Sequence, residues 1–239
     1  MSIKIAAGQI EVGDNIEKNL QKILLAITTA AAQQADYLCL PEICLVSDEK
    51  LIRNINKEIE QIKQAAKKYK INVIFGTYLK IDGHIRNQLW VINKNGETIH
   101  KYNKKHTFFT ERSTVKEGKN NKVLTIDNLN FAVINCWDYA YPEDIRKLAR
   151  DGAQVIFCPS YLVSHPHTKE VLDKIPQVRA FDSMSYFIMV DAFNKETFKR
   201  SKICHPLKTL SSLSDSPGII YATIELTAIT KLRQRFLNL

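Results

Sequence analysis

Three side chains suited to cleaving carbonyl compounds each follow an apolar segment of the kind that forms strands. They are a carboxylate, Glu42, an ammonium group, Lys104, and a thiol, Cys136. A carboxylate can remove the thiol proton, the thiolate can attack a carbonyl carbon, and an ammonium group can stabilise the oxyanion that forms. A fold that gathers these strand ends is therefore expected to carry out acyl transfer through a cysteine nucleophile.

Cys136 stands at a predicted corner between the strand 131–134 and a helix that opens at Pro142. Such a corner exposes a side chain at the sheet edge and directs the following backbone N–H groups to the same place. Taken alone, Cys136 fits a core residue better, because buried cysteines behave as small apolar side chains. The other four cysteines are interpreted as core residues or carry no functional signal: Cys39, Cys44, Cys158 and Cys204.

Glu42 and Lys104 change this interpretation only as a group. A glutamate after a buried strand is suggestive, because glutamate is rarely buried without a partner or a task. The stretch around Lys104, Tyr102-Asn103-Lys104-Lys105-His106, fits a solvated basic turn when it is taken alone. The three residues together are what indicates chemistry.

Strand and helix patterns alternate along the chain. Strands are expected at 3–10, 37–40, 71–78, 88–93, 97–102, 131–134, 155–158, 186–190 and 219–224. Asn95-Gly96 predicts a hairpin between two of them. Because hairpins interrupt the alternation, we expect an α/β protein with mixed sheets and helices packed outside them.

The predicted helices follow the spacing of apolar residues. The first begins at a capping box formed by Asp14 and Glu17. The second covers about 55–69, with an apolar side made of Ile59, Ile62, Ala66 and Tyr69. The others run from Pro142 to about 152, over 168–185 with a kink or restart at Pro176, and over 228–236.

The overall composition is that of a globular protein. Apolar residues make up 45% and charged residues 25% of 239 residues, and no linker composition interrupts them, so we expect a single domain over 1–239. No signal peptide and no apolar run of about 20 residues is visible, which predicts a soluble cytoplasmic protein without membrane association. Five cysteines without a CxxC pair fit a reducing compartment.

The net charge and two histidines raise two other possible functions, nucleic-acid binding and a site built on histidine. The net charge of +9 invites a nucleic-acid function, but the basic residues are spread along the chain without a binding motif, so we expect no nucleic-acid partner. A basic surface can also steer an anionic small substrate. His165 and His167 would supply the base of a papain-like Cys–His pair or two metal ligands, although a solvated loop suits them better and further ligands at matching spacing are missing.

Several motifs in order resemble the nitrilase superfamily of carbon–nitrogen hydrolases over nearly the whole chain. The resemblance rests on Leu40-Pro41-Glu42, on Tyr102 to His106, on the run from Cys136 to Glu143, and on Gly152-Ala153-Gln154 through Cys158-Pro159-Ser160. Asn87, Asn95-Gly96-Glu97 and Arg179-Ala180-Phe181 also fall where that family has motifs. Three short motifs in the right order are far more specific than any one of them.

This resemblance implies a four-layer α-β-β-α sandwich with a Glu42–Lys104–Cys136 triad, in which Lys104 and not Lys105 is the catalytic lysine. It implies that Glu111 helps to hold the lysine and the substrate. In the cycle that we expect from these residues, the backbone N–H of Trp137 helps Lys104 to bind the oxyanion. The resemblance also implies a homodimer or larger homo-oligomer, a small-molecule substrate, and neither a metal nor an organic cofactor.

The chain also departs from the family pattern, which leaves the substrate open. The segment between Glu42 and the helix at about 55 is short, so one wall of the pocket is expected to be open. Ala140 replaces an arginine found in some members, 203–208 keeps the family strand poorly, and Asp182 stands where glutamate is common. Hydrolysis of an amide or N-carbamoyl group through a Cys136 thioester is favoured, with a nitrilase or a degenerate ligand-binding member as the alternatives.

Overall fold

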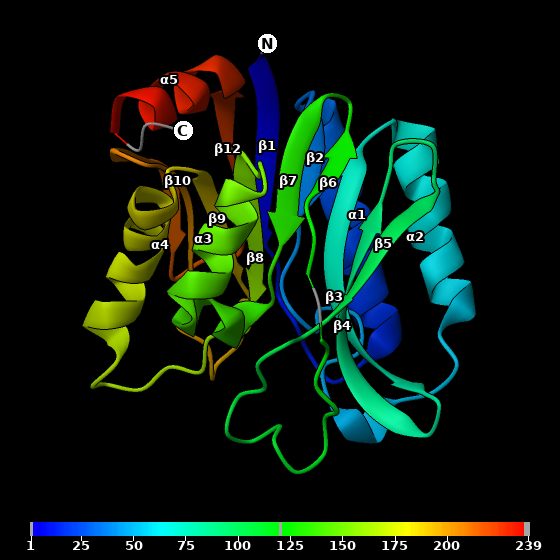
Figure 1. Ribbon diagram of the computed structural model, residues 1–239. Helices are drawn as coiled ribbons and strands as arrows, with labels where there is room; N and C mark the ends of the chain where they lie inside the picture. Colours follow the sequence, from blue (N-terminus) through cyan, green and yellow to red (C-terminus); the bar gives the residue numbers. More distant parts are fainter. Residues whose placement is uncertain (1, 120, 237–239) are drawn as a thin grey trace.

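Two six-stranded sheets lie face to face and helices cover their outer faces in the computed structural model, which describes residues 2–119 and 121–236 (Figure 1). The first sheet has the order β12 (Gly218–Glu225), β1 (Ser2–Gln9), β2 (Tyr37–Cys39), β3 (Asn72–Ile81), β4 (His84–Ile92), β5 (Thr98–Asn103). The second has the order β11 (Lys208–Ser214), β10 (Arg200–His205), β9 (Tyr186–Asp191), β8 (Val155–Ser160), β7 (Leu129–Val133), β6 (Leu124–Ile126). The α/β class and the α-β-β-α sandwich are confirmed.

The helices bury one face each against the sheets. They are α1 (Ile16–Ala32) and α2 (Asn56–Tyr69) on the first sheet, α3 (Pro142–Arg150) and α4 (Lys169–Ser183) on the second, and α5 (Leu226–Phe236) after β12, with short 3-10 turns η1 (Glu49–Leu51) and η2 (Cys136–Ala140). A separate apolar core fills the space between the sheets. Within the described ranges, no helix is both long and apolar enough to cross a membrane.

The strands run so that many of their carboxyl ends meet at one end of the sandwich. β1, β2 and β3 are parallel, and so are β7, β8 and β9. β5 is antiparallel to β4, which is antiparallel to β3, so β5 runs in the direction of β3. Loops that follow these strands can therefore gather side chains from distant parts of the sequence.

Three details of the predicted helices are wrong. Helix α1 is capped by Asn15, whose side chain accepts a hydrogen bond from the N–H of Lys18 at 2.9 Å, and not by Asp14. Tyr69 is 37% exposed and is the last residue of α2, so it does not belong to the buried face of that helix. Helix α4 continues through Pro176, which lies on its buried side, so of the two alternatives predicted there, a kink or a restart, the restart is wrong.

Three strands were missed by the sequence patterns. β6 is short, and β10 and β11 form a hairpin that includes the stretch 203–208. β11 is largely polar and exposed, so it lacks the apolar alternation that marks a half-buried strand. A hairpin at Asp82-Gly83, with φ values of +47° and +78°, also extends β3 and β4 beyond the predicted limits.

Candidate active site

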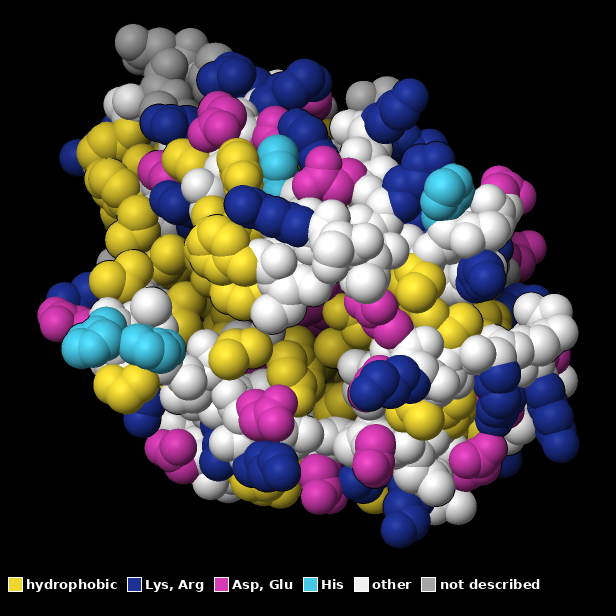
Figure 2. Space-filling model, turned by 90° about the horizontal axis from the view of Figure 1, so that it is seen from below, with side chains coloured by type: hydrophobic (Ala, Val, Ile, Leu, Met, Phe, Trp, Pro, Cys, Tyr) yellow, Lys and Arg dark blue, Asp and Glu magenta, His cyan; other side chains and the backbone are white. Residues whose placement is uncertain are grey.

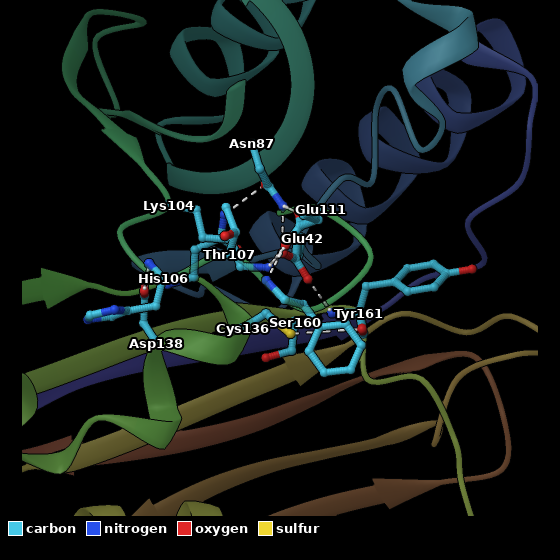
Figure 3. A network of polar contacts seen from close by, with 12 residues as sticks. Glu42, Asn87, Lys104, His106, Thr107, Glu111, Cys136, Asp138, Ser160 and Tyr161 are labelled. Carbon is cyan, nitrogen blue, oxygen red and sulfur yellow. Dashed lines mark hydrogen bonds and ion pairs between the residues drawn. The ribbon is translucent and has the colours of Figure 1, made fainter. Parts of the chain in front are cut away.

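Glu42, Lys104 and Cys136 meet at the carboxyl ends of strands from the two facing sheets (Figure 3). Glu42 follows β2, Lys104 follows β5, and Cys136 opens η2 shortly after β7. Their exposed fractions are 3%, 2% and 6%. The arrangement expected from the sequence, three strand ends gathered at one place, is therefore present in the structure.

Strained backbone surrounds the site on both sides. Cys136 has a φ of +45°, and Ile43, which follows Glu42, has a φ of +46°. Left-handed backbone is unfavourable for a side chain with a Cβ and especially for a β-branched one, and such strain tends to persist at functional sites. Gly76 of β3 lets the backbone of Glu42 and Ile43 approach closely, because a Cβ there would lie 2.8 Å from the Cα of Glu42.

A buried network of charges holds the Lys104 ammonium. Its Nζ donates to Oε1 of Glu42 at 2.7 Å and to Oε2 of Glu111 at 2.6 Å. The amide of Asn87 donates to the same Glu42 oxygen and to Oε1 of Glu111, both at 2.7 Å. The Tyr78 hydroxyl also donates to Glu111, at 3.0 Å. Glu111 is thus brought to Lys104, as the resemblance implied.

The pKa values in this network follow from burial and from the ion pairs. Burial opposes the charge on Lys104, but Glu42 in particular raises the pKa of the ammonium above its ordinary value, so it stays protonated. Burial raises the pKa of Glu42, and Lys104 only partly offsets this. Burial acts on Glu111 in the same direction, yet Lys104 and the donors around that carboxylate bring its pKa below the ordinary value. The two carboxylates therefore differ, and Glu42 is the better proton acceptor.

The thiol lies against one backbone segment. Sγ of Cys136 donates to the carbonyl oxygen of Tyr161 at 3.8 Å, and the N–H of Tyr161 donates to Oε2 of Glu42 at 2.9 Å. The backbone of Tyr161 therefore contacts both the thiol and the Glu42 carboxylate, which brings the two groups to one residue. Burial, and then the charge of Glu42, raise the pKa of Cys136, so the resting thiol is neutral and needs a base.

Asp138 braces the turn that carries Cys136. Its carboxylate accepts from the N–H of Asn135 at 2.9 Å, from the Tyr102 hydroxyl at 2.8 Å and from the N–H of His106 at 2.9 Å. The side chain of Asn135 donates to the Asn87 oxygen at 2.8 Å. The turn is thus tied to the strand end that supplies Lys104 and to the charge network.

Trp137 belongs to an aromatic group beside the site. Its ring lies 5.1 Å from Phe108, 5.8 Å from Phe109 and 5.7 Å from Tyr139, measured between centroids.

Figure 2 looks at the end of the molecule toward which β7 points and shows a hollow lined largely by hydrophobic side chains. The short segment after Glu42 pairs with β3, since the N–H of Leu45 donates to Gly76 at 3.2 Å.

The two histidines considered as a catalytic base or as metal ligands lie apart from the thiol. His165 and His167 are exposed, with rings 5.1 Å apart, and neither is a hydrogen-bond partner of Cys136. In the part of the chain that the structure describes, no three histidine, cysteine or acidic side chains are grouped as metal ligands.

Sequence reasoning missed four residues that complete the site. They are Tyr78, Asn135, Asp138 and Tyr161. Asn87 was noticed only as part of a motif, and Asp138 lies within the run from Cys136 to Glu143, so the motifs contained a signal for both. Tyr161 contributes through its backbone, which no residue pattern reveals.

Comparisons with known proteins agree with this fold. A family model described as carbon–nitrogen hydrolase matches residues 4–234. "Nitrilase homolog 2" of Dictyostelium discoideum is 27% identical over 257 residues, which span 96% of this chain and 77% of that protein. "Deaminated glutathione amidase" of Escherichia coli O157:H7 is 22% identical, over 96% of this chain and 93% of that protein. The crystal structure of a carbon–nitrogen hydrolase from Helicobacter pylori G27 has a TM-score of 0.91 at 19% identity, over 99% of this chain and 94% of that chain.

The fold is that of hydrolases in the nitrilase superfamily. Because the family model covers nearly all of the sequence, the chain belongs to the carbon–nitrogen hydrolase family, and the resemblance stated from its motifs is confirmed. It is an enzyme of that family.

Proposed function

We propose that the protein hydrolyses an amide or N-carbamoyl group of a small molecule through a thioester on Cys136. The observation that carries the proposal is the buried pair of Lys104 and Glu42, with their 2.7 Å ion pair, beside a neutral thiol on a strained turn. A charged donor and a carboxylate of raised pKa are what attack by such a thiol requires. The relative named as an amidase supports an amide over a nitrile.

Each group has one role in the proposed cycle. Glu42 takes the Cys136 proton, the sulfur attacks the carbonyl carbon, and the developing oxyanion is held by Lys104 and the N–H of Trp137. Trp137 is the second residue of η2, where N–H groups lack an acceptor within the helix. The proton on Glu42 then passes to the departing ammonia or amine.

The second half of the cycle restores the thiol. Glu42 takes a proton from water, the hydroxide attacks the thioester carbon, and the proton passes to the departing Cys136 thiolate. Glu111 stays ionised throughout, because its pKa is lowered, and it fixes the Lys104 ammonium from the other side.

The experiment that tests this function is a screen for released ammonia across small amides, N-carbamoyl compounds and nitriles. We expect release from at least one amide or N-carbamoyl compound by the purified protein. Hydrolysis of nitriles alone would show that the class of bond is wrong. No hydrolysis, together with an unreactive Cys136, would show a non-catalytic binding protein.

We also propose that the protein forms a homodimer through the exposed face of α4. Val171, Val178 and Phe181 lie exposed along that helix, and Leu207 lies exposed in the β10–β11 turn. Gln177 of α4 donates to the carbonyl oxygens of His205 and Pro206 in this turn, so the turn adjoins the helix. Several exposed apolar side chains on one helix and an adjoining turn are typical of an interface. Sedimentation equilibrium should give a dimer for the natural chain and a monomer for Phe181→Asp, whereas a monomeric natural chain would refute the interface.

A further inference from the structure

A buried carboxylate outside the triad contacts the backbone segment that lies against Cys136. Asp191, the last residue of β9, is fully buried. Its Oδ1 accepts from the N–H groups of Leu162 and Ala192, both at 2.9 Å, and its Oδ2 accepts from the N–H of Arg200 at 3.3 Å. The proposed cycle gives this carboxylate no task, although burying an acidic group without a cationic partner is unfavourable.

One peptide group joins Asp191 to the nucleophile. The N–H of Leu162 and the carbonyl of Tyr161 belong to the same peptide unit, and in a trans peptide these two groups point in opposite directions. Asp191 accepts from the N–H, while the carbonyl oxygen accepts from Sγ of Cys136 at 3.8 Å. The preceding N–H, that of Tyr161, donates to Glu42 at 2.9 Å. This short segment therefore contacts both the base and the nucleophile.

We propose that Asp191 is a positioning residue, which orients the Tyr161–Leu162 peptide so that the Cys136 thiol and Glu42 lie in the geometry for proton transfer. The proposal rests on the proposed function for its effect on turnover. Its effect on the thiol itself is independent of the identity of any substrate.

The surroundings of Asp191 hold it rigidly. Ser160 and Asp191 are register partners at the ends of the parallel strands β8 and β9. The N–H of Asp191 donates to the Ser201 hydroxyl at 3.0 Å, and that hydroxyl donates to Gln9 of the other sheet at 2.8 Å. Asp191 thus connects the loop after β8 by hydrogen bonds to strands of both sheets.

The contact requires an oxygen acceptor rather than a charge. Burial raises the pKa of Asp191 to about 8, and its N–H donors act in the opposite direction. Oδ1 can accept from Leu162 in either protonation state. Asparagine keeps such an oxygen for Leu162 and Ala192 and loses only the longer contact with the N–H of Arg200, whereas leucine has a similar size and no acceptor.

The test compares Asp191→Leu, Asp191→Asn and a matched control, Ser185→Ala. Ser185 is also buried and precedes the opposite end of β9, where its hydroxyl donates to Ala153 at 3.0 Å. Three quantities are measured for each: the rate of Cys136 alkylation by iodoacetamide, followed by peptide mass spectrometry, kcat and KM for a hydrolysed amide, and the melting temperature. Asp191→Ser, too short to reach Leu162, replaces Asp191→Leu if the latter fails to fold.

We expect Asp191→Leu to lower both kcat and the alkylation rate roughly 10- to 100-fold with little change in KM, because small misplacements of reacting groups have effects of this size. Asp191→Asn should stay close to the natural chain, and Ser185→Ala should lower only the melting temperature. Natural reactivity in Asp191→Leu, or an equal loss of reactivity in Ser185→Ala, would overturn the proposal. So would an Asp191→Asn protein as impaired as Asp191→Leu. Slower alkylation of Asp191→Leu without any amide hydrolysis by the natural chain would sink the proposed function and leave the positioning role standing.

Discussion

The two sheets contribute to the site in different ways. The first sheet supplies charged side chains, Glu42 after β2 and Lys104 after β5, joined by ion pairs shorter than 3 Å. The second sheet supplies a neutral thiol, held by a strained turn and by backbone groups of the loop after β8. The positions of the charged side chains are determined by their ion pairs, whereas the position of the thiol is determined by the backbone conformation around it.

This difference separates two requirements of the proposed chemistry. Buried charges need partners, because an unpaired one is strongly unfavourable, and the partners simultaneously set their pKa values. A neutral thiol needs no partner for its stability but must stand at a defined position. Substitutions on the first side should therefore affect stability and the pKa values of the charged groups together, and substitutions on the second side should lower activity by displacing the turn that carries the thiol.

The largest combined loss of stability and activity is expected from Lys104→Met. It leaves Glu42 and Glu111 buried side by side without the ammonium that pairs with both. Breaking a buried ion pair in this way typically costs about 3–5 kcal/mol, and the loss of an oxyanion donor typically lowers kcat about 100- to 1000-fold. Urea unfolding and steady-state kinetics measure the two losses.

Lys105→Met is the matched control for that experiment. Lys105 is adjacent but one-third exposed, and it pairs with Asp144 at 2.6 Å. Such a pair contributes at most about 1 kcal/mol, so the control should remain active and stable. Equal losses in both variants would refute the division of labour between the two lysines.

A smaller loss is expected from Asp138→Ala on the second side. The change leaves three donors around the turn without their acceptor, those of Asn135, Tyr102 and His106. Each unsatisfied buried donor costs roughly 1–3 kcal/mol, and water entering the space will reduce the sum. We expect the free energy of unfolding to fall by a few kcal/mol and kcat to fall with it. An unchanged kcat would show that the hydrogen bonds of Asp138 are not needed to position Cys136.

Glu111→Gln should reveal a contribution that disappears in acid. The pKa of Glu111 in the folded protein lies below its ordinary value of 4.5, so its ionised form stabilises the fold above that pH. The stabilisation is lost as the pH falls through the folded-state pKa. The free energies of unfolding of the natural chain and the variant should therefore differ by about 1–3 kcal/mol at neutral pH and converge as the pH falls from 4.5 through the folded-state pKa. A constant difference across this range would contradict the account.

The mildest effect concerns the pH dependence of kcat/KM. Glu42 must be ionised to act as base, and burial raises its pKa above 4.5. We expect kcat/KM to fall about tenfold per pH unit on the acid side, with a midpoint above that of an ordinary glutamate. Lys104 should add no limb near neutral pH, because its pKa is raised. A midpoint at or below 4.5 would assign the base to another group.

The parts of the fold that the sequence revealed are those with strong apolar patterns. The central strands of both sheets are apolar and buried, and they were found, whereas β6 and β11 carry too little apolar alternation. Glu42, Lys104 and Cys136 were found because their residue types are chemically meaningful at strand ends and fall in motifs. Tyr161 and Asp191 contribute through contacts that involve backbone groups distant in the sequence. Tyr161 and Glu42, for example, are 119 positions apart, so residue spacing could not predict their hydrogen bond.

The central claim is that the substrate becomes covalently attached to Cys136, and trapping that attachment tests it most directly. The protein is mixed with a hydrolysed amide, quenched in acid and digested, and the peptides are weighed by mass spectrometry. We expect an acyl mass on the peptide that contains Cys136, a loss of at least about 1000-fold in kcat for Cys136→Ala, and retained activity for Cys158→Ala, which alters a neighbouring buried thiol. Turnover by Cys136→Ala at the natural rate, or an acyl group on another cysteine, would contradict the account.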